Sequence, residues 1–334
     1  MNSRRNFLTA ATLVGTAGFL GVRPRSIAAE PPPPETTRLR LGKVPSVCLS
    51  PQYVAEEFLR GEGFADVRYV DVPGGVPGAR MLGAGELDVT MNFAAPLVVS
   101  LDAGDPIVIL AGVHVGCFEL FGTDRVHTIK DLKGKTVAVF GLNSAQHVFL
   151  SAMATQVGLD PRRDITWITP PAAEAKQMLA EGKIDAYLGF PPDPQELRAK
   201  KIGHVVVNSA TDRPWSQYFC CMVSANREFV RKHPVATKRA LRAILKGDGV
   251  CSVEPDRAAK AFLAQGYSIS PAFVAQAIKE IPYGRWREYD SADTLRFYAL
   301  RLHEAGMIKS SPQKILAQGT DWRFLNELKK ELKG

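Results

Sequence analysis

The sequence is poor in cysteine, and its cysteines do not follow a metal-binding or redox pattern. Five of the 334 residues are cysteine, an odd number, and neither a Cys-x-x-Cys pair nor a pair of histidines at ligand spacing occurs. We therefore expect no disulfide framework, no metal site and no cofactor. The cysteines are Cys48, Cys117, Cys220, Cys221 and Cys251.

The sequence also lacks the short motifs of several enzyme classes. It has no Gly-x-Ser-x-Gly, no His-Glu-x-x-His, no glycine-rich phosphate loop and no Gly-x-Gly-x-x-Gly at the start of a helix. These absences argue against nucleophile-elbow hydrolases, zinc proteases and nucleotide-driven enzymes. We predict that the chain is not an enzyme.

A strong excess of one charge is missing as well. The formal net charge is +8, and four of the arginines lie within the first 25 residues. Without them the charge falls to +4, which is too small to indicate a nucleic-acid partner. The other basic residues are spread along helical patterns such as 231–246, which is typical of a solvated face.

One apolar run is present, and it lies at the N-terminus. Arg4 and Arg5 precede Phe7-Leu8 and a moderate apolar stretch, small residues follow at 26–29, and a proline-rich segment comes next. This order predicts an export signal over residues 1–29, with paired arginines that resemble the twin-arginine motif, and a linker over 30–37. No later run approaches the length of a membrane span, so we expect a soluble, periplasmic mature chain.

The rest of the sequence alternates short strand patterns with amphipathic helices, which indicates parallel α/β layers. One unit occurs twice without a gap, at Met81–Val89 and at Met178–Ala186. Each copy has a helix end, a glycine, an aspartate and a strand, and each leads to a phenylalanine at the same offset, Phe93 and Phe190. Because ligands of open α/β sheets bind at the carboxyl ends of strands, we expect two lobes whose Phe93 and Phe190 face one cleft. Burial of both rings in separate cores is the alternative.

Two polar segments follow predicted strands. Asn143 or Ser144 can cap a helix whose first N–H groups, at Ala145 and Gln146, would face an anion or a carbonyl, with His147 in the first turn as a neutral hydrogen-bond partner. Capping without a ligand is the alternative. The corresponding loop of the first lobe offers the small polar side chains of Ser46, Cys48, Ser50 and Gln52.

The adjacent Cys220 and Cys221 lie in an apolar stretch that reads as a buried strand. Neighbouring side chains of a strand point to opposite faces, so we expect these thiols to be apolar wall rather than metal ligands. Trp215 and Tyr218, just before them, are better suited to contact a ligand, since each offers a flat face with one polar group.

Together, residues 50–64, 82–112, 131–139, 181–188 and 224–246 resemble the periplasmic substrate-binding proteins of nitrate, sulfonate, taurine and thiamine-precursor ABC importers. The resemblance covers nearly all of the chain after the signal. It implies the type II periplasmic binding protein fold, in which two α/β lobes are joined by two crossover strands, here near 113–121 and 217–223, and a helical C-terminus follows. Lobe I would comprise 38–118 and 222–334, and lobe II 119–221. It also implies a monomeric receptor that closes on a small molecule and delivers it to an ABC permease and its ATPase.

The same superfamily includes the eukaryotic thiamine-pyrimidine synthase, a pyridoxal-phosphate enzyme with a cysteine cluster where this chain has Phe-Cys-Cys-Met. This enzyme is the alternative function. Its cofactor-binding lysine and reacting histidine correspond here to Asn92 and Pro96, and a Schiff base requires an amine. Its tryptophan in the first loop corresponds to Lys43.

The predicted function is therefore a non-catalytic, extracytoplasmic solute receptor whose ligand is anionic or planar. We expect carboxylates to be absent from the predicted cleft loops, which, with the helix N-terminus, weakly favours an anion. The predicted ligand-binding residues are Ser46, Cys48, Gln52, Asn92, Phe93, His114, Asn143, Ser144, Gln146, His147, Phe190 and Trp215.

Overall fold

The structure is a computed structural model that describes residues 32–332. The predicted signal peptide, residues 1–29, and the first residues of the predicted linker lie outside this range. Within it, none of the helices combines the length and hydrophobicity that crossing a membrane requires.

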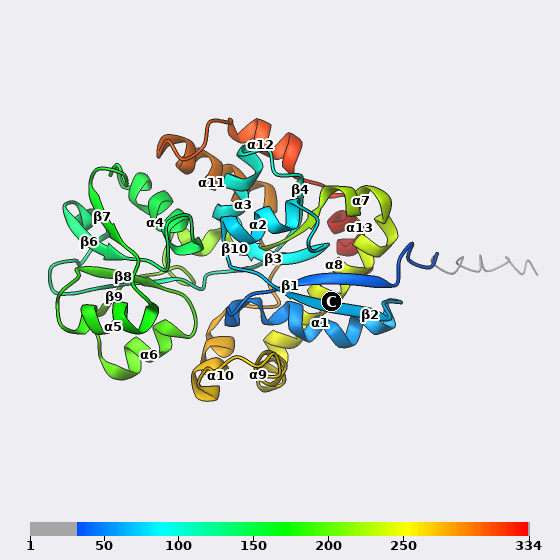
Figure 1. Cartoon of the computed structure of the whole chain (residues 1–334), viewed down its shortest axis with the longest axis horizontal. Helices are drawn as coiled ribbons and strands as arrows, with labels where there is room; N and C mark the ends of the chain where they lie inside the picture. The colour runs from blue at the N-terminus through cyan, green and yellow to red at the C-terminus, as the bar shows by residue number, and fades with distance from the viewer. Residues whose placement is uncertain (1–31, 333–334) are drawn as a thin grey trace, which may run out of the picture. The chain divides into compact units, whose positions relative to one another are not determined.

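Within residues 32–332, ten strands form two sheets of five (Figure 1). The strands of the first sheet are β1 (Arg38–Lys43), β2 (Asp66–Asp71), β3 (Val89–Phe93), β4 (Ile107–Val115) and β10 (Phe219–Asn226). Those of the second sheet are β5 (Glu119–Gly122), β6 (Lys135–Ala138), β7 (Ile165–Ile168), β8 (Ala186–Gly189) and β9 (His204–Asn208).

Helices follow most strands, as the alternating sequence pattern predicts. Around the first sheet lie α1 (Ser50–Gly61), α2 (Val76–Gly83) and α3 (Ala94–Asp102), and around the second lie α4 (Ala145–Gln156), α5 (Ala172–Ala180) and α6 (Asp193–Lys200). The chain then continues as helices only: α7 (Arg227–Lys232), α8 (Pro234–Val253), α9 (Pro255–Leu263), α10 (Pro271–Glu280), α11 (Ser291–Glu304), α12 (Pro312–Gly319) and α13 (Arg323–Glu331). The prediction of a helical C-terminus is confirmed.

The two sheets share one topology. Their strand orders are β2-β1-β3-β10-β4 and β7-β6-β8-β5-β9, and in each the fourth strand is antiparallel to its neighbours. In each sheet this fourth strand follows a crossover from the other sheet. Three residues lead from β4 of the first sheet to β5 of the second, and residues 209–218 lead from β9 of the second sheet back to β10 of the first. A chain that leaves one sheet at the carboxyl end of a parallel strand enters the next sheet at the same side, so it runs antiparallel there. The predicted two-lobe fold with two crossovers is confirmed, although the second crossover lies earlier than 217–223.

The repeated sequence unit is also a repeated structure. Gly85 and Gly182 end the two helices with φ of 79° and 66°, a backbone conformation that favours glycine. The aspartate of each unit then binds the neighbouring parallel strand. Asp88 accepts a hydrogen bond from the backbone N–H of Arg40 at 2.7 Å, and Asp185 accepts one from that of Thr136 at 2.8 Å. The two copies therefore hold β3 and β8 in equivalent positions within their sheets.

Part of the predicted linker is packed on the first lobe. The Glu35 carboxylate accepts hydrogen bonds from the backbone N–H groups of Val235 and Ala236, both at 2.9 Å, in the first turn of α8. A carboxylate at a helix N-terminus binds free N–H groups and the positive end of the helix dipole. These hydrogen bonds hold the pKa of Glu35 below its usual value, although burial works in the opposite direction.

Candidate functional site

A cleft of about 480 Å³ opens where the parallel strands of both lobes end. In lobe I it is lined by residues that follow β1 and β2, by Phe93 at the end of β3, and by Ile269 and Phe273 before and within α10. In lobe II it is lined by Phe140 after β6, by the start of α4, and by residues of α5, β8 and α6. This is the position that open α/β sheets provide for ligands.

Aromatic rings from both lobes meet in the cleft. The ring centroids of Phe93 and Phe190 are 6.1 Å apart with an interplanar angle of 63°, an edge-to-face contact. Phe118, in the first crossover, lies 5.3 Å from Phe93 and 6.4 Å from Phe190. Phe140 is 63% exposed, so the aromatic wall of the cleft is open to solvent on the side of lobe II.

The start of α4 brings polar groups to the cleft. Ser144 is the N-cap, and its hydroxyl oxygen accepts a hydrogen bond from the backbone N–H of His147 at 3.3 Å. Ser144, Ala145 and Gln146 all line the cleft. Gln146 is 2% exposed, and its Nε2 has no hydrogen-bond partner within the described residues. A buried amide donor without a partner is unfavourable, so this group is available to a ligand acceptor.

A charged cluster that the sequence analysis missed lies in the wall of lobe II. The Lys176 ammonium, in α5, lies 2.8 Å from the Asp193 carboxylate and also pairs with Glu196, both in α6. The Tyr187 hydroxyl donates to Asp193 at 2.5 Å. Burial works against the charge of Lys176, but the two carboxylates raise its pKa. The expectation that carboxylates are absent from the cleft is therefore wrong, because α6 begins at the cleft and carries two of them.

The structure brings five of the twelve predicted ligand-binding residues to the cleft wall. These are Ser46, Phe93, Ser144, Gln146 and Phe190.

Two other predicted residues, Gln52 and Asn92, form hydrogen bonds with main-chain groups of neighbouring segments. The Gln52 amide binds the carbonyl oxygen of Gly42 at 2.5 Å and the N–H of Met91 at 2.8 Å, and so joins β1 to β3. The Asn92 amide binds both the N–H and the carbonyl oxygen of Gly75, at 3.2 and 3.0 Å. Asn92 thus shapes the loop that ends in Gly75 rather than lining the cleft.

Three more predicted residues lie around α4 without lining the cleft. Asn143 has a φ of 62° and is exposed, and its backbone N–H donates to Nδ1 of His147 at 3.2 Å. Burial lowers the pKa of His147 to about 4, which favours the neutral ring near pH 7. Trp215 is buried in the second crossover, where it packs against Phe149 and Phe297.

The last two, Cys48 and His114, are buried behind the cleft. The Cys48 thiol lies 3.1 Å from the Ser46 hydroxyl, and His114 Nε2 lies 3.0 Å from the Cys48 carbonyl oxygen. Burial works to lower the pKa of His114, but the hydrogen bond with Cys48 and neighbouring negative charges raise it to about 9.

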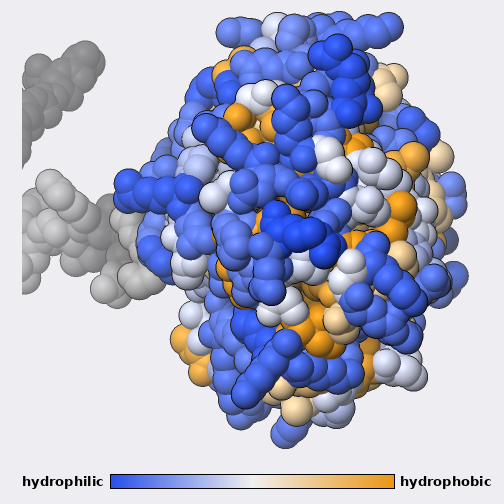
Figure 2. Space-filling view, turned by 90° about the vertical axis from the view of Figure 1, so that its left-hand side faces the viewer, coloured by the Kyte–Doolittle hydropathy of each residue, from blue (hydrophilic) through white to orange (hydrophobic). Residues whose placement is uncertain are grey.

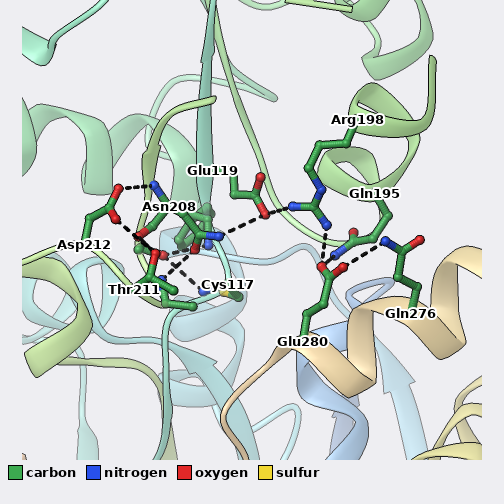
Figure 3. A network of polar contacts seen from close by, with 12 residues as sticks. Cys117, Glu119, Gln195, Arg198, Asn208, Thr211, Asp212, Gln276 and Glu280 are labelled. Carbon is green, nitrogen blue, oxygen red and sulfur yellow. Dashed lines mark hydrogen bonds and ion pairs between the residues drawn. The ribbon is translucent and has the colours of Figure 1, made fainter. Parts of the chain in front are cut away.

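A polar network joins the two lobes beside the cleft (Figure 3). Arg198 of α6 pairs with the buried Glu119 of β5 and also with Glu280 of α10, in lobe I. Gln195 donates to the same Glu280 carboxylate at 2.8 Å. Burial raises the pKa of Glu119, and Arg198 counteracts this rise. The network holds α6 and α10 together in the observed arrangement of the lobes.

The exposed face at the lobe II end is mostly hydrophilic, and its hydrophobic areas are separated by hydrophilic ones (Figure 2).

Comparison with known proteins gives one family and one fold. The model of the NMT1-like family matches residues 32–265. The bicarbonate-binding protein CmpA of Synechococcus elongatus is 26% identical over 140 residues, which are 41% of this chain and 31% of that protein. The chain therefore aligns with about a third of the length of the curated relatives it matches.

Solved structures confirm the fold. The alkanesulfonate-binding protein SsuA from Xanthomonas axonopodis pv. citri, bound to MOPS, has a TM-score of 0.66 at 19% identity, over 83% of this chain and 96% of that one. The periplasmic nitrate-binding protein NrtA from Synechocystis PCC 6803 has a TM-score of 0.69 at 16% identity, over 90% of each chain. At these identities the similarity shows the fold alone.

Proposed function

Because this chain belongs to the NMT1-like family, we propose that it is an extracytoplasmic solute receptor that captures a small molecule between its lobes and delivers it to an ABC importer. The observation that carries this proposal is the cleft between the carboxyl ends of the two sheets, with an unpartnered donor, Gln146 Nε2, in its wall. Such a site can bind a solute through apolar contacts and hydrogen bonds.

The chemistry of the cleft supports a ligand with two parts. Phe93, Phe140 and Phe190 provide apolar faces for a planar or aliphatic group. Gln146 and the first N–H groups of α4 provide donors for an acceptor group, and a negative charge is favoured there by the helix dipole. The similar proteins named above bind alkanesulfonate, nitrate or bicarbonate, which supports an anionic acceptor.

The carboxylates of Asp193 and Glu196 restrict where such an anion can lie. Lys176 is already paired with both, so the cluster has no free positive charge to offer. A like charge nearby is unfavourable in a cleft of low dielectric. We therefore expect the acceptor group at α4 and the apolar part of the ligand toward α6.

We further propose that the chain is not an enzyme. The position that would hold pyridoxal phosphate in the synthase is Asn92, whose amide binds Gly75, and the reacting histidine is replaced by Pro96 in α3. Neither residue supplies an amine or an imidazole.

The remaining proposals concern the surroundings of the receptor. Residues 1–29 would direct export, by the twin-arginine route, to the periplasm. The lobes would comprise 38–118 with 222–334, and 119–221. The mature chain would act as a monomer that meets a permease and its ATPase.

A ligand screen tests this function. The chain without residues 1–29 is melted with alkanesulfonates, nitrate, bicarbonate, aromatic carboxylates and pyrimidines, because a ligand that binds only the native state raises Tm. We expect one class to raise Tm without being consumed. Consumption of a solute, or an absorbing aldimine after pyridoxal phosphate is added, would support the enzyme instead.

A further inference from the structure

Four of the five cysteines gather with one histidine where the two crossovers meet lobe I. Cys48 follows β1, His114 lies near the end of β4, Cys117 lies in the first crossover, and Cys220 with Cys221 begin β10 after the second. All five side chains are buried. Their donor atoms form two groups of three, Cys48 with His114 and Cys221, and Cys117 with Cys220 and Cys221, and within each group the atoms lie within 4.8 Å of one another.

A β-bulge creates this cluster. Phe219 pairs with Val115 of β4, but the next residue of β4, His114, pairs with Cys221 instead of Cys220. Cys220 is therefore the extra residue of the bulge, and a bulge re-aims side chains that would alternate in a regular strand. The Sγ atoms of Cys220 and Cys221 lie 3.8 Å apart. The expectation that these two thiols point to opposite faces is wrong.

The spacing of the sulfur atoms fits a tetrahedral metal. Cys48 Sγ and Cys221 Sγ are also 3.8 Å apart. In a tetrahedral site with metal–sulfur bonds of about 2.3 Å, the edge between two sulfur atoms is about 3.8 Å. The cluster offers four thiols and one imidazole, and among the described residues their donor atoms come together in groups of three, so a fourth ligand would have to move toward a bound tetrahedral ion. All of the cysteines are free in the structure.

The surroundings of His114 fit the role of a ligand. Its Nδ1 lies 3.2 Å from the carbonyl oxygens of both Val115 and Gly116, while Nε2 lies 3.0 Å from that of Cys48. A neutral imidazole carries one N–H, so it can donate from one ring nitrogen only. In the metal-free ring both nitrogens face carbonyl oxygens, which favours a proton on each. A cation would displace the Nε2 proton, and the remaining Nδ1 proton, held by backbone carbonyls, is the arrangement commonly found behind a metal-bound histidine.

From these contacts we propose that Cys48, His114, Cys117, Cys220 and Cys221 form a buried binding site for one thiophilic, closed-shell cation, Zn²⁺ or Cu⁺. Thiolate and imidazole ligands suit both ions. The site lies directly behind the cleft wall, because the Ser46 hydroxyl, in the wall, touches the Cys48 thiol.

The position of the site means that a bound cation would affect how the two lobes are connected. Cys117 lies in one crossover, and Cys220 and Cys221 follow the other, while Cys48 and His114 belong to lobe I. A bound cation would tie both crossovers to lobe I at the place where the lobes must bend. Ser209 already links the crossovers at this point, since its hydroxyl accepts from the N–H groups of Cys117 and Phe118 at 3.1 and 2.9 Å. This inference does not depend on which solute the cleft binds.

Metal content of the whole chain without residues 1–29 tests the proposal. The protein is purified under reducing conditions, incubated with Zn²⁺ or Cu⁺, freed of excess ion and measured by elemental mass spectrometry. We expect about one ion per chain. The variant Cys221→Ser removes the thiol that both groups share, and we expect its metal content to fall at least about tenfold. Cys251→Ser, at a buried cysteine outside the cluster, should keep the full content.

A spectroscopic measurement distinguishes the loss of a metal ligand from a folding defect in the variant. Co²⁺ bound by thiolates in a tetrahedral site gives a charge-transfer band and intense visible bands, which the wild type and Cys251→Ser should show. Cys117→Ala, which leaves three thiols and the imidazole, should shift these bands. Folding of each variant is checked by circular dichroism. Two results would overturn the proposal. One is a wild-type protein that takes up no metal although its thiols react as free groups after unfolding, and the other is a mass that shows disulfides.

Discussion

Gly75 of lobe I lies against the backbone of Ala145 in lobe II. A Cβ at Gly75 would come within 2.9 Å of the Ala145 nitrogen and 3.2 Å of the Asn143 carbonyl oxygen. Real Cβ atoms do not approach backbone nitrogen so closely, so the observed arrangement of the lobes requires glycine at this position. The contact lies at the start of α4, beside the donors of the cleft.

This contact predicts that Gly75→Ala holds the lobes apart. We expect the variant to fold and to lose solute binding by about tenfold or more, since a displacement of about 1 Å is enough to misplace binding groups. The Tm shift given by the solute found in the screen measures the loss.

Gly85→Ala is the matched control. Gly85 has a φ of 79°, close to the 83° of Gly75, but a Cβ there meets only Asn226 Nδ2, at 3.8 Å. Both variants should lose about 1–3 kcal/mol of stability because both glycines have positive φ, and the loss should be larger at Gly75, whose ψ of −149° is essentially restricted to glycine. Only Gly75→Ala should lose binding. Equal binding in the two variants would show that the lobes do not meet here.

A second prediction concerns the unpartnered donor in the cleft. Gln146→Leu removes a buried Nε2 without breaking a hydrogen bond of that atom, so the unliganded variant should be as stable as the wild type or about 1–2 kcal/mol more stable. Solute binding should weaken. Gln52→Leu is the contrast, because both polar atoms of Gln52 bind backbone, and its loss should lower Tm. A Gln146→Leu variant that is less stable but binds normally would contradict this assignment.

The third prediction concerns the network between α6 and α10. Glu280→Gln removes the charge that pairs with Arg198 across the lobes, yet leaves Glu119 with its own partner. Ion pairs at a solvated edge are worth about 0–1 kcal/mol, so Tm should change little. If the network restrains the lobes, arrangements in which the lobes lie farther apart should become more populated. Small-angle X-ray scattering without solute should then give a larger radius of gyration.

Glu288→Gln is the control for this experiment, because Glu288 pairs with Arg285 within lobe I. Its scattering should match that of the wild type. An unchanged radius in Glu280→Gln would mean that the network does not restrain the lobes.

The fourth prediction is a pH dependence of stability. Burial lowers the pKa of His147 from 6.5 to about 4, so between these values the unfolded chain binds more protons than the folded one. Stability from this group is fully present above pH 6.5 and is lost as pH falls toward 4, by at most about 3 kcal/mol. The free energy of unfolding is measured with denaturant at several pH values. It should fall less steeply between pH 6.5 and 4 in His147→Asn than in the wild type.

The sequence predicted the parts of the molecule that depend on local pattern. The repeated unit with Asp88 and Asp185 identified equivalent strands, and the rule for strand ends then placed Phe93 and Phe190 at one cleft, where their rings meet. The cap at Ser144 was equally local, since a serine before an apolar helix predicts it.

Features that depend on tertiary contacts could not be predicted. The side chains of Gln52 and Asn92 bind backbone of other segments, which no local pattern reveals. Lys176 and Glu196 read as surface charges of two helices until the fold brings α5 and α6 together. The cysteine cluster was missed because a strand pattern implies alternation, and the bulge at Cys220 breaks it.

The distance between the lobes in solution tests the central claim most directly. Spin labels are placed at Leu142→Cys, exposed beside the cleft in lobe II, and at Ala264→Cys, exposed at the end of α9 in lobe I, while the native thiols stay buried. Pulsed dipolar spectroscopy is recorded with and without the solute that raises Tm. A receptor that closes on its ligand predicts a broad or double distribution that narrows to the shorter distance when the solute binds. One distribution that does not change at saturating solute would contradict it.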